Sequence, residues 1–261
     1  MVCRPPNSHN THEVFLFQVY LVGHIAPGSN ERHRGAYPPS HISYSDHHNK
    51  KYLKIVRRYA SIIVGQFFGH LHSDTFRVIY GENGRPISWA LLAPSITPKR
   101  NNDGPNNPGL RLYKFDKDTG QVFDYTQYYL DLSGAIANPN RNVEWSVEYN
   151  FSTYYSINDI NAVNLHTLAD KLTHDTPQEN SIFSRYYRAN SVRFNSGTAA
   201  LAQCDSHCAH THYCAITRVD YDEFHQCLQT AASALSASAA TSAVAMRTIA
   251  KIVLVMWVIV R

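Results

Sequence analysis

The sequence carries little charge and has no apolar run of the length that crosses a membrane. Charged residues make up 17% of its 261 residues, and the net charge is +4 with neutral histidines. A weak positive charge that is scattered along the chain argues against a nucleic acid polymer as a partner. The apolar stretch 249–260 is interrupted by Lys251, and it falls short of the about 20 residues that a transmembrane helix needs. Hydrophobic residues still account for 44% of the chain, which is enough for a packed core.

A recognisable secretion signal is also missing. Residues 14–22 are apolar, as in the central region of a signal peptide, but Gln18 interrupts them and no small-residue cleavage site follows. We therefore interpret residues 14–22 as a buried strand that leads to His24.

Cysteine is scarce outside one cluster near the C-terminus. Cys3 stands alone, and the cluster consists of Cys204, Cys208, Cys214 and Cys227. An even number of clustered cysteines fits a disulfide framework in an oxidising compartment. A zinc site is the alternative, since His210 and His212 lie between the cysteines. The C-x2-C pairs of structural zinc sites are absent, which favours disulfides, but the sequence alone does not choose among the possible pairings.

Three histidines follow two of the apolar segments. Segments 14–22 and 61–68 each run into a Gly-His step, which gives His24 and His70, and His72 comes two residues later. Neutral imidazole is the commonest side-chain ligand of metals. On an extended backbone, His70 and His72 would project to the same side. If the two segments are buried strands, their carboxyl ends meet at one sheet edge, where α/β sheets bind ligands. The sequence therefore predicts a metal site there.

The remaining periodicity predicts one helix and then strands up to residue 149, followed by helices, in a mixed α/β (α+β) fold. Strands are expected at residues 61–68, 73–80, 86–93, 110–115, 122–130 and 145–149, and helices at 50–59, 158–172, 181–187 and 219–228. We expect the first three strands to form a β-meander, with an Asn83-Gly84 hairpin turn before the third. Asn158 is the expected N-cap of its helix, and Asp74 is expected to cap a turn.

Several of these segments together resemble one protein family. They are VGHIAPG at 22–28, KYLKIVRRYASIIVGQFFGHLHSDTFRV at 51–78, ISWALLAPSITP at 87–98 and NNPGLRLYKFD at 106–116. In this order and spacing they resemble the C-terminal part of the acid sphingomyelinase-like phosphodiesterases, which are calcineurin-like metallophosphoesterases. The resemblance extends from about residue 18 to residue 227.

The resemblance implies a division of the chain. The expected parts are an unmatched leader (1–17), the C-terminal half of a metallophosphoesterase β-sandwich with flanking helices (18–145), a small helical cysteine-rich domain (146–228), and an Ala/Ser-rich spacer with a hydrophobic tail (229–261). The resemblance also implies the disulfides Cys204–Cys208 and Cys214–Cys227.

By resemblance, His24 and His70 would bind one zinc ion and His72 a second. The family's other ligands are an Asp-x-His pair, a bridging Asp and an Asn-His pair. Like its catalytic histidines, they come from strands upstream of VGHIAPG, and the residues before Gly23 supply none of these motifs. We therefore expect this chain to be a fragment that is inactive alone. Asn106 and Asn107 lie near the catalytic face by resemblance, or else form a plain turn.

The implied function is zinc-dependent hydrolysis of a phosphodiester, either sphingomyelin or a nucleotide. The alternatives are a non-catalytic remnant that binds or supports a partner, and a zinc-binding cysteine/histidine module. The sequon at Asn150, with Phe151 and Ser152, predicts N-glycosylation and fits a secreted or lysosomal protein. The small residues of 231–245 before the apolar end resemble a GPI-attachment signal, which predicts membrane association through the tail.

Overall fold

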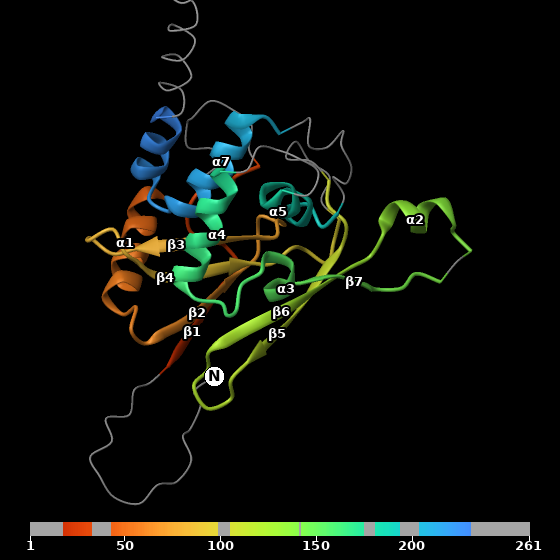
Figure 1. Cartoon of the computed structure of the whole chain (residues 1–261), viewed down its shortest axis with the longest axis horizontal. Helices are drawn as coiled ribbons and strands as arrows, with labels where there is room; N and C mark the ends of the chain where they lie inside the picture. Colours follow the sequence, from red (N-terminus) through yellow and green to blue (C-terminus); the bar gives the residue numbers. More distant parts are fainter. Residues whose placement is uncertain are drawn as a thin grey trace, which may run out of the picture.

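The computed structural model describes residues 18–32, 43–98, 105–140, 142–174, 181–193 and 204–230. The predicted leader and all but the first two residues of the predicted tail lie outside this part, so the GPI signal does too. The strands are β1 (Val19–Val22), β2 (Ile63–Phe68), β3 (Thr75–Tyr80), β4 (Pro86–Leu92), β5 (Gly109–Phe115), β6 (Val122–Tyr129) and β7 (Ser146–Asn150). The helices are α1 (Asp46–Arg58), α2 (Leu132–Ala137), α3 (Phe151–Tyr155), α4 (Ala162–His174), α5 (Ile182–Asn190) and α7 (Ser206–Thr217), followed by a helical stretch at 221–230. Figure 1 shows their arrangement.

The first sheet has the strand order β1-β2-β4-β3. β1 and β4 both run parallel to β2, and only β3 and β4 form an antiparallel pair. The hairpin turn at Glu82-Asn83-Gly84 is confirmed, but it is a three-residue turn closed by Gly81 N donating to Arg85 O at 2.9 Å. Gly84 has a positive φ of 74° and Asn83 does not, so the turn is not the two-residue Asn-Gly type. The expected β-meander is wrong, because residues 69–74 carry the chain past the neighbour of β2 to the sheet edge, and β4 then returns between β2 and β3.

The second sheet is antiparallel, with the order β5-β6-β7. Its inner face carries aromatic side chains that meet the first sheet: the ring centroids of Tyr113 and Phe67 are 4.9 Å apart, and Phe67 also contacts Trp89. The two sheets therefore pack face to face over an aromatic layer, as the fold prediction requires.

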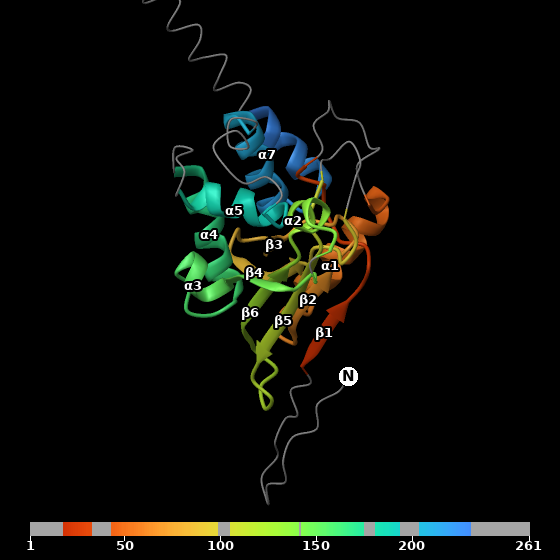
Figure 2. The same cartoon turned by 90° about the vertical axis from the view of Figure 1, so that its right-hand side faces the viewer.

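Helices cover both faces of the first sheet (Figure 2). α1 packs through Leu53 and Val56 against Ile63 and Ile79, while α4 and α7 contact β3 and β4 from the other side. That second core also includes residues of β6 and β7, so one continuous hydrophobic cluster extends across the proposed domain boundary at residue 145. α2 has no buried residue and projects from the body (Figure 1).

Local hydrogen bonds explain where the helices begin. Ser45 caps α1 through His48 N, and Ser181 caps α5 through Ser184 N. The expected cap at Asn158 is wrong, because the side chain of Asn161 accepts from Asn164 N at 2.8 Å and α4 starts only at Ala162.

Both disulfides implied by the resemblance are present in the C-terminal helical region: Cys204–Cys208 and Cys214–Cys227. They tie α7 to Cys204, two residues before the helix begins, and to the stretch 221–230. Within the ranges that the structure describes, no helix is both long enough and apolar enough to cross a membrane.

Candidate metal site at the sheet edge

Parallel pairing of β1 with β2 brings His24 and His70 together. Val22 lies opposite Phe67, and the pairing continues beyond the strands, because Gly69 N donates to His24 O at 3.0 Å. His24 Nε2 and His70 Nδ1 are consequently 3.3 Å apart, and both side chains are exposed. The prediction that two strand ends deliver histidines to one edge is confirmed. The prediction that the first strand is buried is wrong, because β1 is an edge strand in which none of Val19–Val22 is buried.

The His24–His70 pair has the spacing of two ligands on one cation. Tetrahedral zinc with Zn–N bonds of about 2.0–2.1 Å holds two imidazole nitrogens about 3.3 Å apart. The observed 3.3 Å is the same distance, although an N–H···N hydrogen bond between neutral rings has a similar length. The distance between these two nitrogens is therefore compatible with a shared zinc ion.

The backbone that carries His70 and His72 is not extended. Both residues lie in the left-handed region, with φ of 67° and 57°, and the segment between β2 and β3 is irregular. The argument that side-chain alternation sends both rings to one side is therefore wrong. Non-glycine residues in this conformation are uncommon, and they cluster where a site fixes the backbone.

His72 is half-buried and is held from behind through its backbone. Its carbonyl accepts a hydrogen bond from Asn106 Nδ2. Asn106 Oδ1 in turn accepts from Arg32 Nη1 at 2.6 Å. Asn106 thus links the loop after His24 to the loop of His70 and His72.

The structure does not bring all three histidines into one ligand set. Across the described ranges, groups of three or more His, Cys, Asp or Glu ligand atoms within 4.8 Å of one another occur only in the C-terminal helical region. His24 and His70 are therefore brought together, and His72 lies outside that limit. That His72 belongs to a second metal position stays a prediction.

Asn106 and Asn107 are buried, with 1% and 5% of their surface exposed. Asn107 Nδ2 donates to Val192 O at 2.9 Å, and its Oδ1 accepts from Leu132 N at 3.1 Å. Both amides hold loops together, and a contact of either with substrate stays a prediction.

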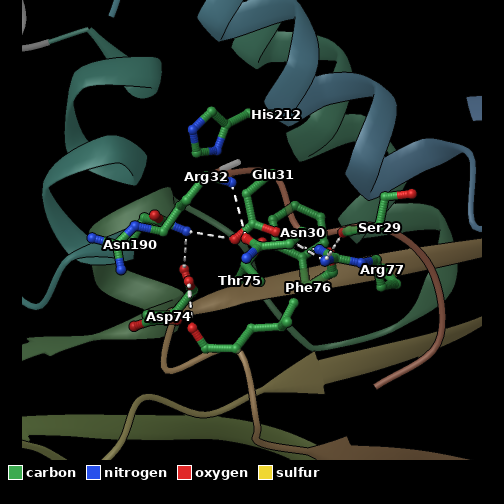
Figure 3. A network of polar contacts seen from close by, with 12 residues as sticks. Ser29, Asn30, Glu31, Arg32, Asp74, Thr75, Phe76, Arg77, Asn190 and His212 are labelled. Carbon is green, nitrogen blue, oxygen red and sulfur yellow. Dashed lines mark hydrogen bonds and ion pairs between the residues drawn. The ribbon is translucent and has the colours of Figure 1, made fainter. Parts of the chain in front are cut away.

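A buried ion pair joins the segment that follows His24 to β3, the strand that follows His72 (Figure 3). Arg77 Nη2 is 2.9 Å from Glu31 Oε2, and both side chains are fully buried. The same nitrogen donates to Ser29 O at 2.8 Å, and Asn190 Nδ2 donates to Glu31 Oε1 at 3.0 Å. Burial by itself raises the pKa of Glu31, but the charges of Arg77 and His212 and hydrogen bonds from the backbone and Asn190 bring it down to about 2. Glu31 is therefore ionised, and its ion pair with Arg77 joins the His24 loop to β3.

Asp74 occupies a second buried polar cluster. Its Oδ1 is 2.5 Å from Arg111 Nη2, and its Oδ2 accepts from Tyr149 OH at 2.5 Å. The guanidinium of Arg111 stacks 3.9 Å above the ring of Tyr125. The expectation that Asp74 merely caps a turn is wrong, since its carboxylate joins the end of the histidine loop to the second sheet.

Sequence reasoning missed this supporting layer. Glu31 and Arg77 are 46 positions apart, and Asp74 and Arg111 have no shared motif. One available signal was Arg77 itself, a charged residue in the middle of an otherwise apolar strand, since a buried charge requires a partner.

The comparisons with known proteins identify the family. The model of the acid sphingomyelin phosphodiesterase C-terminal region matches residues 85–234, which is more than half of the chain. Acid sphingomyelinase-like phosphodiesterase 3b from Homo sapiens is 35% identical over 215 residues, which cover 80% of this chain and 44% of that protein. Cyclic GMP-AMP phosphodiesterase SMPDL3A from Mus musculus is 33% identical, covering 81% and 45%. Sphingomyelinase phosphodiesterase C from Dictyostelium discoideum is 27% identical, covering 81% and 46%.

The chain therefore belongs to the acid sphingomyelin phosphodiesterase family, which confirms the resemblance seen in its motifs. It spans less than half the length of these curated relatives.

Proposed function

We propose that this chain contributes His24, His70 and His72 to the two-zinc site of a phosphodiesterase of the acid sphingomyelinase-like type. The observation that carries the proposal is the His24–His70 pair, whose nitrogens lie 3.3 Å apart at the carboxyl ends of two parallel strands. The family supports the reaction class, because the relatives are named as phosphodiesterases.

The residues of this chain bind and orient in that mechanism. When bound, two zinc ions would grip phosphate oxygens and lower the pKa of the attacking water. His24 and His70 present their ring nitrogens to one cation, and His72, fixed by Asn106, would serve the other. The Glu31–Arg77 pair keeps the two histidine loops at a constant separation.

Three neutral imidazoles do not balance two divalent cations. Carboxylate ligands must share the site, and the acidic residues nearest in sequence, Glu31 and Asp74, are already engaged with arginines. We therefore propose that the 261 residues alone have little or no turnover, and that further ligands complete the site. The substrate is a phosphodiester, either sphingomyelin or a nucleotide.

The same proposal places the protein in a secretory compartment. The two disulfides fit an oxidising environment. Glycosylation of Asn150 stays a prediction; its side chain caps α3, and its amide donates to Tyr125 O at 3.4 Å.

Cobalt(II) titration of the oxidised chain tests the metal ligands directly. His24→Ala and His70→Ala should each weaken binding by more than about a hundredfold, which exceeds the loss of about 10–100-fold that supporting residues cause. His47→Ala is the matched control, since His47 is an exposed histidine on α1 and not part of the site. Equal cobalt affinity in all three variants would show that His24 and His70 are not metal ligands.

The test of activity uses a longer protein in which Asp-x-His and Asn-His motifs precede Val22. Such a protein should hydrolyse bis(p-nitrophenyl) phosphate only with zinc, and His72→Ala should abolish turnover. Undiminished hydrolysis by His72→Ala would refute its role. Binding of metal without hydrolysis by the complete protein would favour the non-catalytic alternative.

A further inference from the structure

His210 directs its Nε2 atom at a disulfide. Nε2 lies 3.2 Å from Cys214 Sγ and 3.9 Å from Cys227 Sγ. His210 and Cys214 are four residues apart on α7, so they share one face of the helix. Cys227 comes from the helical stretch 221–230, and the three ligand atoms lie within 4.8 Å of one another. A buried scaffold fixes them, because Cys214 is fully buried against Phe224.

The three atoms have nearly the geometry of a thiolate and imidazole metal site. Zinc with bonds of about 2.3 Å to sulfur and about 2.05 Å to nitrogen places the nitrogen about 3.6 Å from each sulfur. The observed distances of 3.2 and 3.9 Å lie on either side of this value. Only the two sulfurs must move apart, to a separation of about 3.8 Å.

We propose that reduction of Cys214–Cys227 creates a zinc site formed by the two thiolates and His210. A dithiol reductant supplies two electrons and two protons, so that the S–S bond breaks, two thiols form and the reductant becomes its own disulfide. Zinc binding then releases the two thiol protons and forms two Zn–S bonds and one Zn–N bond. A water molecule fills the fourth position.

His210 can change its role without losing its proton. In the oxidised protein Nε2 lies 2.8 Å from the carbonyl oxygen of Cys227 and donates to it. On binding a cation, the ring proton moves to Nδ1 and Nε2 becomes the ligand. The helical region is then held by a metal where the disulfide held it before.

The second set of ligands, Cys204, Cys208 and His212, is less suited to this exchange. His212 is only 1% exposed. Its Nδ1 lies 3.1 Å from Tyr186 OH, and its ring contacts Phe183. This imidazole is part of the core, so the test below removes the two cysteines of this set.

The test is cobalt(II) titration of the full chain, reduced anaerobically with a phosphine. The chain carries Cys3→Ser, Cys204→Ser and Cys208→Ser, so that only the proposed thiols remain. We expect a thiolate-to-metal charge-transfer band that saturates with one equivalent of cobalt at the thiols, apart from any cobalt held by His24 and His70, and we expect zinc to abolish the band. Because imidazoles alone give no such band, the readout is independent of His24 and His70.

His210→Gln should weaken this binding by more than about tenfold. His207→Gln, an exposed histidine on the same helix, should not change it. Two results would overturn the proposal: no charge-transfer band after reduction, or a band of equal affinity in the His210→Gln variant. Equal affinity would also be the result if the reduced chain were unfolded and bound cobalt through its thiols alone.

Discussion

Replacement of Arg77 by methionine is the sharpest test of the buried support behind the histidine loops. Arg77→Met keeps much of the side-chain volume but removes the cation that faces Glu31 at 2.9 Å, with both side chains fully buried. It also deletes the bond to Ser29 O. Glu31 would keep its hydrogen bond from Asn190 but lose its charge partner.

The magnitude follows from the carboxylate. Glu31 has a pKa of about 2 against an ordinary value of 4.5, and this gap of about 2.5 units corresponds to about 3 kcal/mol of stability at neutral pH. Removal of one partner from a buried ion pair costs about 3–5 kcal/mol, because the other charge stays buried. Folded domains are stable by only about 5–15 kcal/mol, so the variant should be close to unfolding.

Urea unfolding of the wild type, Arg77→Met, Glu31→Gln and the double variant measures this effect as a thermodynamic cycle. The double variant should be more stable than the sum of the single losses predicts, since it buries no unpaired charge. Because the pKa of Glu31 is lowered, its contribution is complete above about pH 4.5 and is lost as the pH falls toward 2. Lys50→Met, in an exposed ion pair, is the control with little effect. A loss below about 1 kcal/mol for Arg77→Met, or strictly additive losses, would refute the reasoning.

Three further predictions follow from other parts of the molecule. Burial and nearby Asp74 raise the pKa of Glu148, so the contribution of its protonated form to stability is complete at low pH and is lost as the pH rises. Glu148→Gln should therefore raise the melting temperature at pH 7, with a smaller gain at pH 4. Loss of the Cys214–Cys227 disulfide through paired serine substitutions should cost about 3 kcal/mol in urea unfolding, as expected for a closed loop of this size. Gly109→Ala should destabilise by about 1–3 kcal/mol, because the added Cβ would lie 2.6 Å from a Pro94 side-chain atom; unchanged stability would show that this contact relaxes freely.

Local patterns were sufficient for the elements that depend on local chemistry. The Asn83-Gly84 turn specified the β3–β4 hairpin, and the apolar segments ending at Gly-His specified the edge where His24 and His70 meet. The order of the strands in the first sheet does not follow from local sequence patterns. Whether β3 or β4 lies beside β2 depends on the path of residues 69–74, and the meander prediction failed there.

The prediction of the site was wrong where tertiary contacts hold residues outside the backbone conformation that their type prefers. His70 and His72 adopt left-handed conformations that no alternation rule foresees. The sequence also did not predict the helix α7, because its cysteines, histidines and threonines have modest helix propensity. Its helical geometry is what aligns His210 with Cys214 at a spacing of four residues.

The histidine loops depend on the C-terminal helical region for their position. Asn190, at the end of α5, donates to Glu31 and accepts from Asp74 N at 3.1 Å, so it touches both loops. Asn107 reaches the same region through Val192 O. The hydrophobic cluster that includes β3, β4, α4 and α5 continues without a break across residue 145. A metal site at the sheet edge therefore draws its rigidity from residues beyond the predicted sandwich half, because the groups that fix His24 and His72 are themselves fixed by α5 and the residues after it.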